Sequence, residues 1–243
     1  MNYTIHHFKS LTSTQDKARE FAKKDLSNII IVSDVQTKGR GRFKRIWYSG
    51  KNGLYMSVLL NPRNAANMQY LTFAAAVAVA KAIKKIANIE TKIKWPNDVH
   101  YKNRKLCGIL TEGIFGKENY VIVGIGVNVN QDKFPDEIKN IATSLRIIKN
   151  KKIKREKLFR KILYGFFVLY EKYNKNKFKN ILKEWKKYCD TINKDVVVIT
   201  RTGKFSGKVI GIDKNCSLLL KTAKNKIIRI TEGDINVRAK HNI

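Results

Sequence analysis

The stretch Lys94-Trp95-Pro96-Asn97-Asp98, followed by Lys105-Leu106-Cys107-Gly108-Ile109-Leu110-Thr111-Glu112, predicts a strand, a rigid turn and a second strand. Pro96 ends the first strand because proline fixes φ and has no backbone donor. A hairpin across residues 101–104 would bring Lys105 close to Asp98. Asn97 and Asp98 are also ordinary turn residues. A cation, an aromatic ring, an amide and a carboxylate within five residues nevertheless favour a ligand site.

A second segment, Gln36-Thr37-Lys38-Gly39-Arg40-Gly41-Arg42, alternates glycine with arginine just after an expected strand. Glycine lets the backbone approach a ligand closely, and the arginine fork suits carboxylate and phosphate. We expect residues 39–53 to form a loop that stays mobile until an anionic ligand orders it. Trp47 would then fold back as a lid or stack on a base. A disordered basic surface loop is the alternative.

The hydrophobic periodicity predicts an α+β fold, with a mixed or antiparallel sheet flanked by helices. A helix begins near Thr12, because Thr12 and Gln15 fit a capping box. An alanine-rich segment predicts a long helix over 70–86. Apolar runs predict strands at 29–32, 54–60, 93–95, 105–112 and 120–127.

The pattern changes near residue 193. From Val196 onward the helical period disappears, and four or five short strands separated by turns predict a small β-barrel. We therefore expect two domains, over residues 1–192 and 193–243.

Composition narrows the class of protein. Of 243 residues, 43% are hydrophobic, which is enough for a substantial core. No run of about 18 uncharged apolar residues predicts a membrane span, and the N-terminus lacks the apolar stretch of a signal peptide. The three cysteines, Cys107, Cys189 and Cys216, match neither a disulfide framework nor a zinc site. These features predict a cytoplasmic protein without membrane contact.

The formal net charge of +31 makes nucleic acid the first partner to consider. Between Arg146 and Lys187, however, 16 basic and 3 acidic residues accompany apolar residues at helical spacing. We interpret these lysines as the solvated faces of two amphipathic helices. A nucleic-acid-binding basic protein is the alternative.

Gly124-Ile125-Gly126 ends an expected strand but lacks the third glycine of the dinucleotide fingerprint. We interpret these glycines as places where the strand can border a ligand. The histidines show no metal-ligand spacing, and we expect all four at the surface: His6, His7, His100 and His241. No metal site within the protein is predicted.

Taken together, these segments resemble the biotin protein ligases (biotin–[acetyl-CoA-carboxylase] ligases), and the similarity follows nearly the whole chain in order. Ser13-Thr14-Gln15 looks like the family's Ser-Thr-Asn element, with glutamine in place of asparagine. The glycine–arginine segment is similar to the ligand-ordering loop, in which Lys44 occupies a position that is often glycine. Residues 94–98 resemble the family's pentapeptide, and residues 104–110 resemble its catalytic-lysine strand.

The last residues, including Glu232-Gly233-Asp234-Ile235, look like the family's SH3-like module. Because the similarity begins at the N-terminus, we expect the short class, without the winged-helix domain that makes some members DNA-binding repressors.

The resemblance implies an ATP-dependent, AMP-forming ligase with two half-reactions. Biotin and Mg-ATP would give biotinyl-5′-AMP and pyrophosphate, and a lysine of a biotin carboxyl carrier domain would then attack the mixed anhydride. ATP, substrate-bound Mg²⁺ and biotin are the expected small molecules. The expected protein partners are the biotin-acceptor domain of a biotin-dependent carboxylase and a second copy of the chain in a homodimer, without specific DNA binding.

The resemblance also implies the site residues. The expected catalytic residues are Lys105, Arg42, Lys94 and Asp98. The expected biotin-binding residues are Ser13, Thr14, Gln15, Gln36, Gly39, Arg40, Gly108 and Gly126. The expected ATP or adenylate contacts are Arg40, Arg42, Arg45, Trp47, Asn97, Lys105, Asn130 and Arg238. A lipoate protein ligase-type acyl transferase is the nearest rival, and the arginine-rich loop and the pentapeptide favour biotin over it.

Overall fold

A seven-stranded sheet forms the centre of the larger domain in this computed structural model, which describes residues 3–237. The strand order is β1-β2-β3-β7-β6-β5-β4. Strands β1 and β2 are parallel and the other neighbours are antiparallel, so the predicted mixed sheet is confirmed. The strands are β1 (Thr4–Phe8), β2 (Ile29–Ser33), β3 (Leu54–Leu60), β4 (Lys92–Lys94), β5 (Asp98–Tyr101), β6 (Arg104–Ile114) and β7 (Tyr120–Val127).

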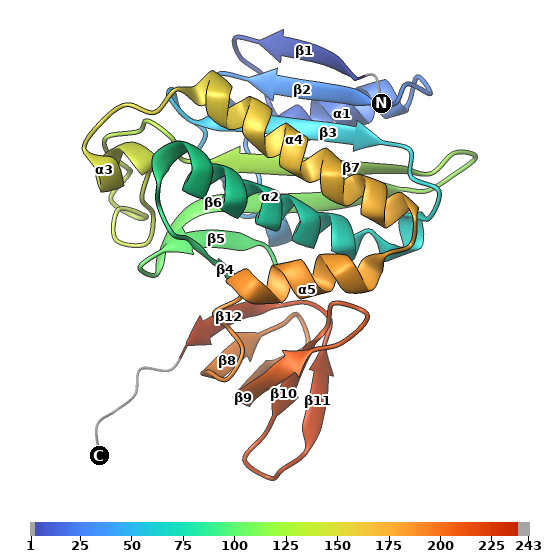
Figure 1. The fold of residues 1–243 in the computed structure, drawn as a ribbon, viewed down its shortest axis with the longest axis vertical. Helices are drawn as coiled ribbons and strands as arrows, with labels where there is room; N and C mark the ends of the chain where they lie inside the picture. The colour runs from blue at the N-terminus through green and yellow to red at the C-terminus, as the bar shows by residue number, and fades with distance from the viewer. Residues whose placement is uncertain (1–2, 238–243) are drawn as a thin grey trace.

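Helices cover both faces of this sheet (Figure 1). They are α1 (Thr14–Ala22), α2 (Gln69–Ala87), α3 (Leu145–Lys149), α4 (Arg155–Asn174) and α5 (Phe178–Tyr188), with 3-10 turns η1 (Arg42–Lys44) and η2 (Ala65–Asn67). Helix α1 packs on one face, against β2, β3 and β7, and α2 and α4 pack side by side on the other. The strands between these helices are covered on both sides, which explains why all seven residues of β3 are buried.

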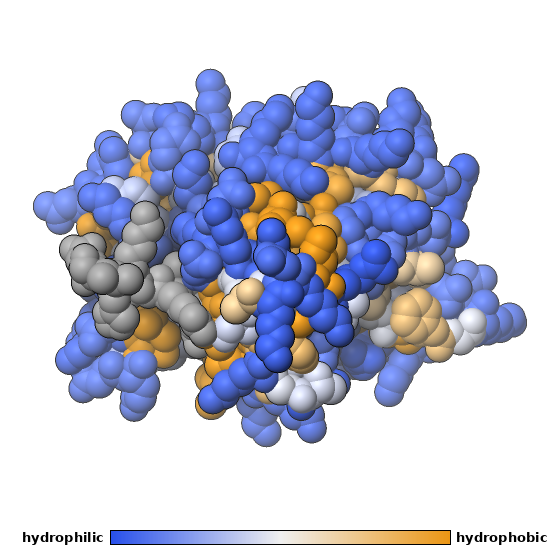
Figure 2. Space-filling view, turned by 90° about the horizontal axis from the view of Figure 1, so that it is seen from below, coloured by the Kyte–Doolittle hydropathy of each residue, from blue (hydrophilic) through white to orange (hydrophobic). Residues whose placement is uncertain are grey.

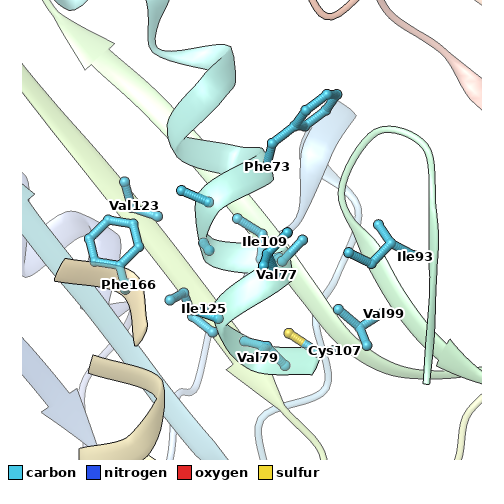
Figure 3. Packing of buried hydrophobic residues seen from close by; sticks show 14 of the residues in the cluster. Phe73, Val77, Val79, Ile93, Val99, Cys107, Ile109, Val123, Ile125 and Phe166 are labelled. Atoms are coloured by element: carbon cyan, nitrogen blue, oxygen red, sulfur yellow. The ribbon is translucent and has the colours of Figure 1, made fainter. Parts of the chain in front are cut away.

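The alanines of α2 allow close packing on two sides. Ala78 faces α4 at Gly165, where a Cβ would lie 3.4 Å from the Ala78 Cβ. On the sheet side, Figure 3 shows Val77 and Val79 of α2 packed among residues of β6 and β7, including Cys107, Ile109 and Ile125. The sheet with α2 and α4 therefore forms one continuous core.

Helices α4 and α5 are amphipathic, as predicted. Leu158, Ile162 and Phe166 of α4 and Trp185 of α5 are buried, whereas the α5 lysines 179, 183, 186 and 187 are exposed. Figure 2, seen from the barrel end, shows a surface that is largely hydrophilic around a smaller apolar patch. None of the helices between residues 3 and 237 has the length and apolar content to cross a bilayer.

The smaller domain is a five-stranded antiparallel sheet of SH3-like type, as predicted, in the order β11-β10-β9-β8-β12. Its strands are β8 (Asp195–Ile199), β9 (Lys204–Ile212), β10 (Leu218–Lys221), β11 (Ile227–Ile230) and β12 (Asp234–Val237). Trp95 joins the two domains, because its indole Nε1 donates to the Cys216 carbonyl of the barrel at 2.9 Å. Its backbone N–H donates to Thr191 Oγ1 at 3.1 Å, just before the barrel begins.

Three local expectations differ from the structure. The N-cap of α1 is Ser13, whose Oγ accepts from the Gln15 N–H, so the capping box at Thr12 was wrong. His100 is buried, with Nε2 3.0 Å from Asp190 Oδ2, because β5 places it at the junction with the barrel. Strand β1 was not expected, because its half-exposed residues show no clear alternation. His241 lies outside the described residues.

Candidate active site

A pocket of about 300 Å³ lies between the glycine–arginine loop, the start of β6 and the end of β7. This volume is at the lower end of the range for small-molecule sites. The pocket contains thirteen of the residues predicted from the sequence: Ser13, Thr14, Gln15, Gln36, Arg40, Arg42, Arg45, Trp47, Asn97, Asp98, Lys105, Gly108 and Gly126. Segments from the start of α1 at Ser13 to the barrel at Asp234 thus meet in one cavity.

Lys105 and Asp98 form an ion pair on one wall, with Nζ 2.7 Å from Oδ1. The β5–β6 hairpin brings them together, as predicted, because Asp98 lies opposite Gly108 in the register and Lys105 precedes a shift in that register. The ammonium group also lies 5.3 Å from the centre of the Trp47 ring. Carboxylate and aromatic ring together fix the position of the lysine beside the cavity.

The glycine–arginine loop folds back on itself as a small hairpin over the pocket. Trp47 N–H donates to the Gly39 carbonyl at 2.9 Å, and Gly41 N–H donates to the Arg45 carbonyl at 2.7 Å. Phe43 and Lys44 at its tip have φ of 54° and 58°. Glycine adopts this left-handed region without penalty, so Lys44 stands at a position where the backbone itself favours glycine.

Trp47 turns inward and lies against strands β6 and β7. A Cβ at Gly126 would come within 2.4 Å of the indole Nε1, and a Cβ at Gly108 within 3.2 Å of its Cζ3. The absence of side chains at these two positions therefore leaves room for the indole. Trp47 Nε1 is buried and has no hydrogen-bond partner among the described residues.

Two arginines connect the loop to other parts of the molecule. Arg42 donates to Asn97 Oδ1 at 3.3 Å and to the Gly233 carbonyl of the barrel at 3.1 Å. Arg45 pairs with Asp234 at 2.5 Å. Burial lowers the pKa of Arg42 from its ordinary value, against the opposing effect of the Asp234 and Asp98 carboxylates. The barrel thus contacts the loop that closes the pocket.

Hydrogen bonds organise the opposite end of the pocket. Gln36 Oε1 accepts from the Thr14 N–H at 2.8 Å and from Thr14 Oγ1 at 3.1 Å. Ser57 Oγ lies 2.8 Å from Thr14 Oγ1 and donates to Gln15 Oε1 at 2.9 Å. Ser13, Thr14 and Gln15 occupy the start of α1, so the helix fixes their positions relative to β3.

Three predicted residues do not line the pocket. Lys94 belongs to β4, the strand beyond β5 at the edge of the sheet. Gly39 is packed within the loop, where a Cβ would meet Ser49 Oγ at 2.3 Å. Asn130 is buried, and its amide both donates to and accepts from the backbone of Ile153, at 2.9 and 2.8 Å. Arg238 lies outside the described residues.

The sequence reasoning missed several lining residues. Asn128 is a polar lining residue directly after β7, two residues before Asn130, which was the predicted nucleotide contact. Its Oδ1 accepts from Gln131 Nε2 at 3.3 Å. Asp234 comes from the barrel, and Phe134, Ile138 and Ile141 come from a segment without regular periodicity. The glycine-x-glycine-x-asparagine pattern was the available signal for Asn128, and none marked the apolar residues.

Comparison with known proteins matches both domains. The family model "Biotin/lipoate A/B protein ligase family" matches residues 7–130, and "Biotin protein ligase C terminal domain" matches residues 191–238. The bifunctional ligase/repressor BirA of Bacillus subtilis is 41% identical over 242 residues, which cover 97% of this chain and 74% of that protein.

One solved structure and a further sequence relative agree. The biotin protein ligase of Aquifex aeolicus in complex with biotin and ATP superposes with a TM-score of 0.86 at 33% identity, covering 97% of this chain and 98% of that one. A biotin–[acetyl-CoA-carboxylase] ligase of Mycobacterium tuberculosis is 33% identical over 134 residues, 53% of this chain and 48% of that protein. These matches cover both domains and fit the pocket that the loop, sheet and barrel enclose. The chain therefore belongs to the biotin protein ligase family.

Proposed function

We propose that the protein activates biotin with Mg-ATP to biotinyl-5′-AMP and transfers the biotinyl group to a lysine of a biotin carboxyl carrier domain. The observation that carries this proposal is the pair Lys105–Asp98, at 2.7 Å, on the wall of a pocket that Arg40 and Arg42 also line. Joining two anions, a carboxylate and an α-phosphate, requires such a set of fixed cations.

In the first half-reaction, a carboxylate oxygen of biotin attacks the α-phosphorus of ATP, and the bond to the β-phosphate oxygen breaks to release pyrophosphate. Lys105 and Arg42 neutralise the negative charge that repels the two substrates and builds up on the phosphate. Lys94 lies outside the pocket wall, so it supports this step only through the long-range electrostatic attraction of its charge for the phosphates.

The loop then protects the product. Arg40, Arg45 and Trp47 close over the mixed anhydride and exclude water, which would otherwise hydrolyse it. Ser13, Thr14 and Gln36 bind the ureido group of biotin by hydrogen bonds, because these side chains offer both donors and acceptors at the polar end of the pocket. Gly108 and Gly126 border the ligand.

The nucleotide occupies the end of the pocket formed by Asn97, Lys105 and Asn128 in this proposal. Mg²⁺ arrives on the ATP phosphates and neutralises part of their charge. Asp98 and Asn97 are oxygen donors on that wall, of the kind that Mg²⁺ prefers.

In the second half-reaction, a neutral lysine amine of the acceptor attacks the carbonyl of the anhydride, and AMP leaves. The amine must lose its proton, and Asp98 is the pocket carboxylate beside Lys105 that can orient it or accept that proton. If Asp98→Asn slowed adenylation but not transfer, Asp98 would instead serve the Mg-ATP side.

The test is biotin-dependent exchange between ATP and pyrophosphate, measured with purified protein and Mg²⁺ beside a lipoate control. Exchange with biotin and not with lipoate is the expected result. Exchange with lipoate alone would move the protein to the lipoate ligases that share its first family model. Absence of exchange with either acid in a folded sample would refute the adenylating function and leave nucleic acid as the partner to test.

Four further expectations belong to this proposal. The chain is expected to act in the cytoplasm as two units, over residues 1–192 and 193–243, and to bind no specific DNA. It is also expected to form a homodimer through an exposed edge of the sheet. Among the described residues, no strand pairs with the outer edge of β1. Light scattering on the purified protein would give the oligomeric state directly.

A further inference from the structure

Arg40 is held between two carboxylates that belong to different layers of the fold. Its Nη1 lies 2.5 Å from Asp16 Oδ1, on α1, and its Nη2 lies 3.2 Å from Glu112 Oε2, on β6. The Arg40 and Glu112 side chains are each 26% exposed, and that of Asp16 is 44% exposed. The guanidinium therefore bridges a helix and a strand that lie far apart along the chain.

Glu112 also organises the floor of the pocket. The same Oε2 atom accepts from Gln15 Nε2 at 2.9 Å, and Arg19 Nη2 lies 3.6 Å away. Gln15 is buried, its second N–H is directed at the Leu110 carbonyl at 3.3 Å, and its Oε1 accepts from Ser57. Both donors of the Gln15 amide thus have partners within the protein, so Gln15 supports the pocket rather than offering a free donor to biotin.

Arg40 is also the residue at which the loop hairpin closes. It forms an antiparallel bridge with Ile46, and the neighbouring Gly39 carbonyl accepts from the Trp47 N–H. Fixing Arg40 therefore fixes the two strands of the hairpin and the indole that follows them. On the far side, the loop contacts the barrel through Arg42 and Arg45.

The charge composition makes this arrangement unusual for the chain. Only 19 acidic residues accompany 50 basic ones, yet two of them flank one arginine. We propose that Asp16 and Glu112 form with Arg40 a clasp, made of protein side chains alone, that holds the loop over the pocket and determines how long the acyl-adenylate is retained. Asp16 and Glu112 are positioning residues, since they act through Arg40. The part of this inference that concerns retention of the adenylate rests on the proposed function.

The first test needs no ligand. Lys38, Lys44 and Arg45 are exposed sites for trypsin in the loop, and cleavage there reports how often the loop opens. In full-length protein, we expect Asp16→Asn and Glu112→Gln each to accelerate this cleavage about 2- to 5-fold, the effect of losing one partly exposed ion pair. Glu156→Gln is the matched control, because it breaks an exposed pair with Arg160 on α4, at 2.7 Å, away from the loop.

Unchanged cleavage in both clasp variants, with the control also unchanged, would overturn the proposal. Accelerated cleavage in the control by the same factor would overturn it too, since the effect would then be general. Asp16→Asn alters a side chain at the surface of α1, so it tests the clasp even if Glu112→Gln fails to fold. Asp16→Glu, which keeps the charge, should return cleavage towards the native rate.

The second test follows escape of the adenylate. Protein is loaded with biotin and Mg-ATP without acceptor, and the rate at which biotinyl-5′-AMP leaves is measured at about 0.05 M and about 0.5 M salt. We expect the clasp variants to release it about 2- to 5-fold faster at low salt. Salt should accelerate release from the native protein more than from the variants. Equal release rates and equal salt dependence would overturn retention by the clasp, whereas native protein that forms no adenylate would refute the proposed function instead.

Discussion

Replacement of Lys105 by alanine separates catalysis from folding in this protein. The Lys105 ammonium lies 2.7 Å from Asp98, and the two side chains are 37% and 25% exposed. A pair that is partly solvated contributes about 1 kcal/mol or less to stability. The same cation, aimed at charge that develops on a phosphate, contributes far more to the rate, about 2.7–4 kcal/mol for one fixed donor. We therefore expect Lys105→Ala to slow adenylation about 10²- to 10³-fold while the free energy of unfolding changes little.

The assay is single-turnover formation of biotinyl-5′-AMP, run beside urea denaturation of the same samples. Asp98→Asn should slow the step about 10-fold, because Lys105 loses the partner that orients it. The double variant carries both Lys105→Ala and Asp98→Asn. Position 98 then has no lysine to orient and no unpaired carboxylate to repel the phosphates. The adenylation rate of the double variant should therefore be no lower than that of Lys105→Ala alone. Adenylation by Lys105→Ala at a rate near the native one, or losses that add in the double variant, would refute this reasoning.

Three other changes test the fold and the site. Glu184→Gln should destabilise the protein at neutral pH but not in acid, because side-chain hydrogen bonds from Lys187 and Lys81 lower the pKa of Glu184 to about 2. The stability that these bonds contribute is present above about pH 4.5 and is lost as the pH falls towards 2. Urea denaturation at several pH values would detect this difference. Phe73→Ala should cost about 3–5 kcal/mol of unfolding free energy, because the ring is buried in the main core, and a loss below about 1 kcal/mol in urea would contradict that packing. Asn130→Ala should cost about 1–3 kcal/mol through two buried hydrogen bonds while the KM for ATP changes little, and a large rise in KM with unchanged stability would restore it as a nucleotide contact.

Sequence-based prediction succeeded where a pattern is local. The strands predicted at 54–60 and 120–127 coincide with β3 and β7, because each is a short apolar run buried on both faces. The alanine-rich helix and the amphipathic α4 follow from helical periodicity. The pair of Lys105 with Asp98 was also predictable, since a tight hairpin leaves few ways to arrange residues only seven positions apart.

Prediction failed where a residue's role depends on distant partners. Asn130 looks like a ligand contact from its place after Gly-x-Gly, but the chain returns to it at Ile153 and uses its amide there. His100 looks like a surface histidine, but the segment that follows α5 covers it at Asp190. Neither partner has a local signal, because each depends on how a later segment packs.

The sequence by itself determined the elements, the hairpin that carries the lysine, and the glycine–arginine loop, because backbone propensity and hydrophobic periodicity act over a few residues. Only the tertiary structure decided what the loop contacts. Arg40 meets Glu112 at a separation of 72 residues, and Arg42 meets the Gly233 carbonyl at a separation of 191. Such contacts follow from the order of the strands and from the docking of the barrel, and their energy is gained only after the loops between them have closed.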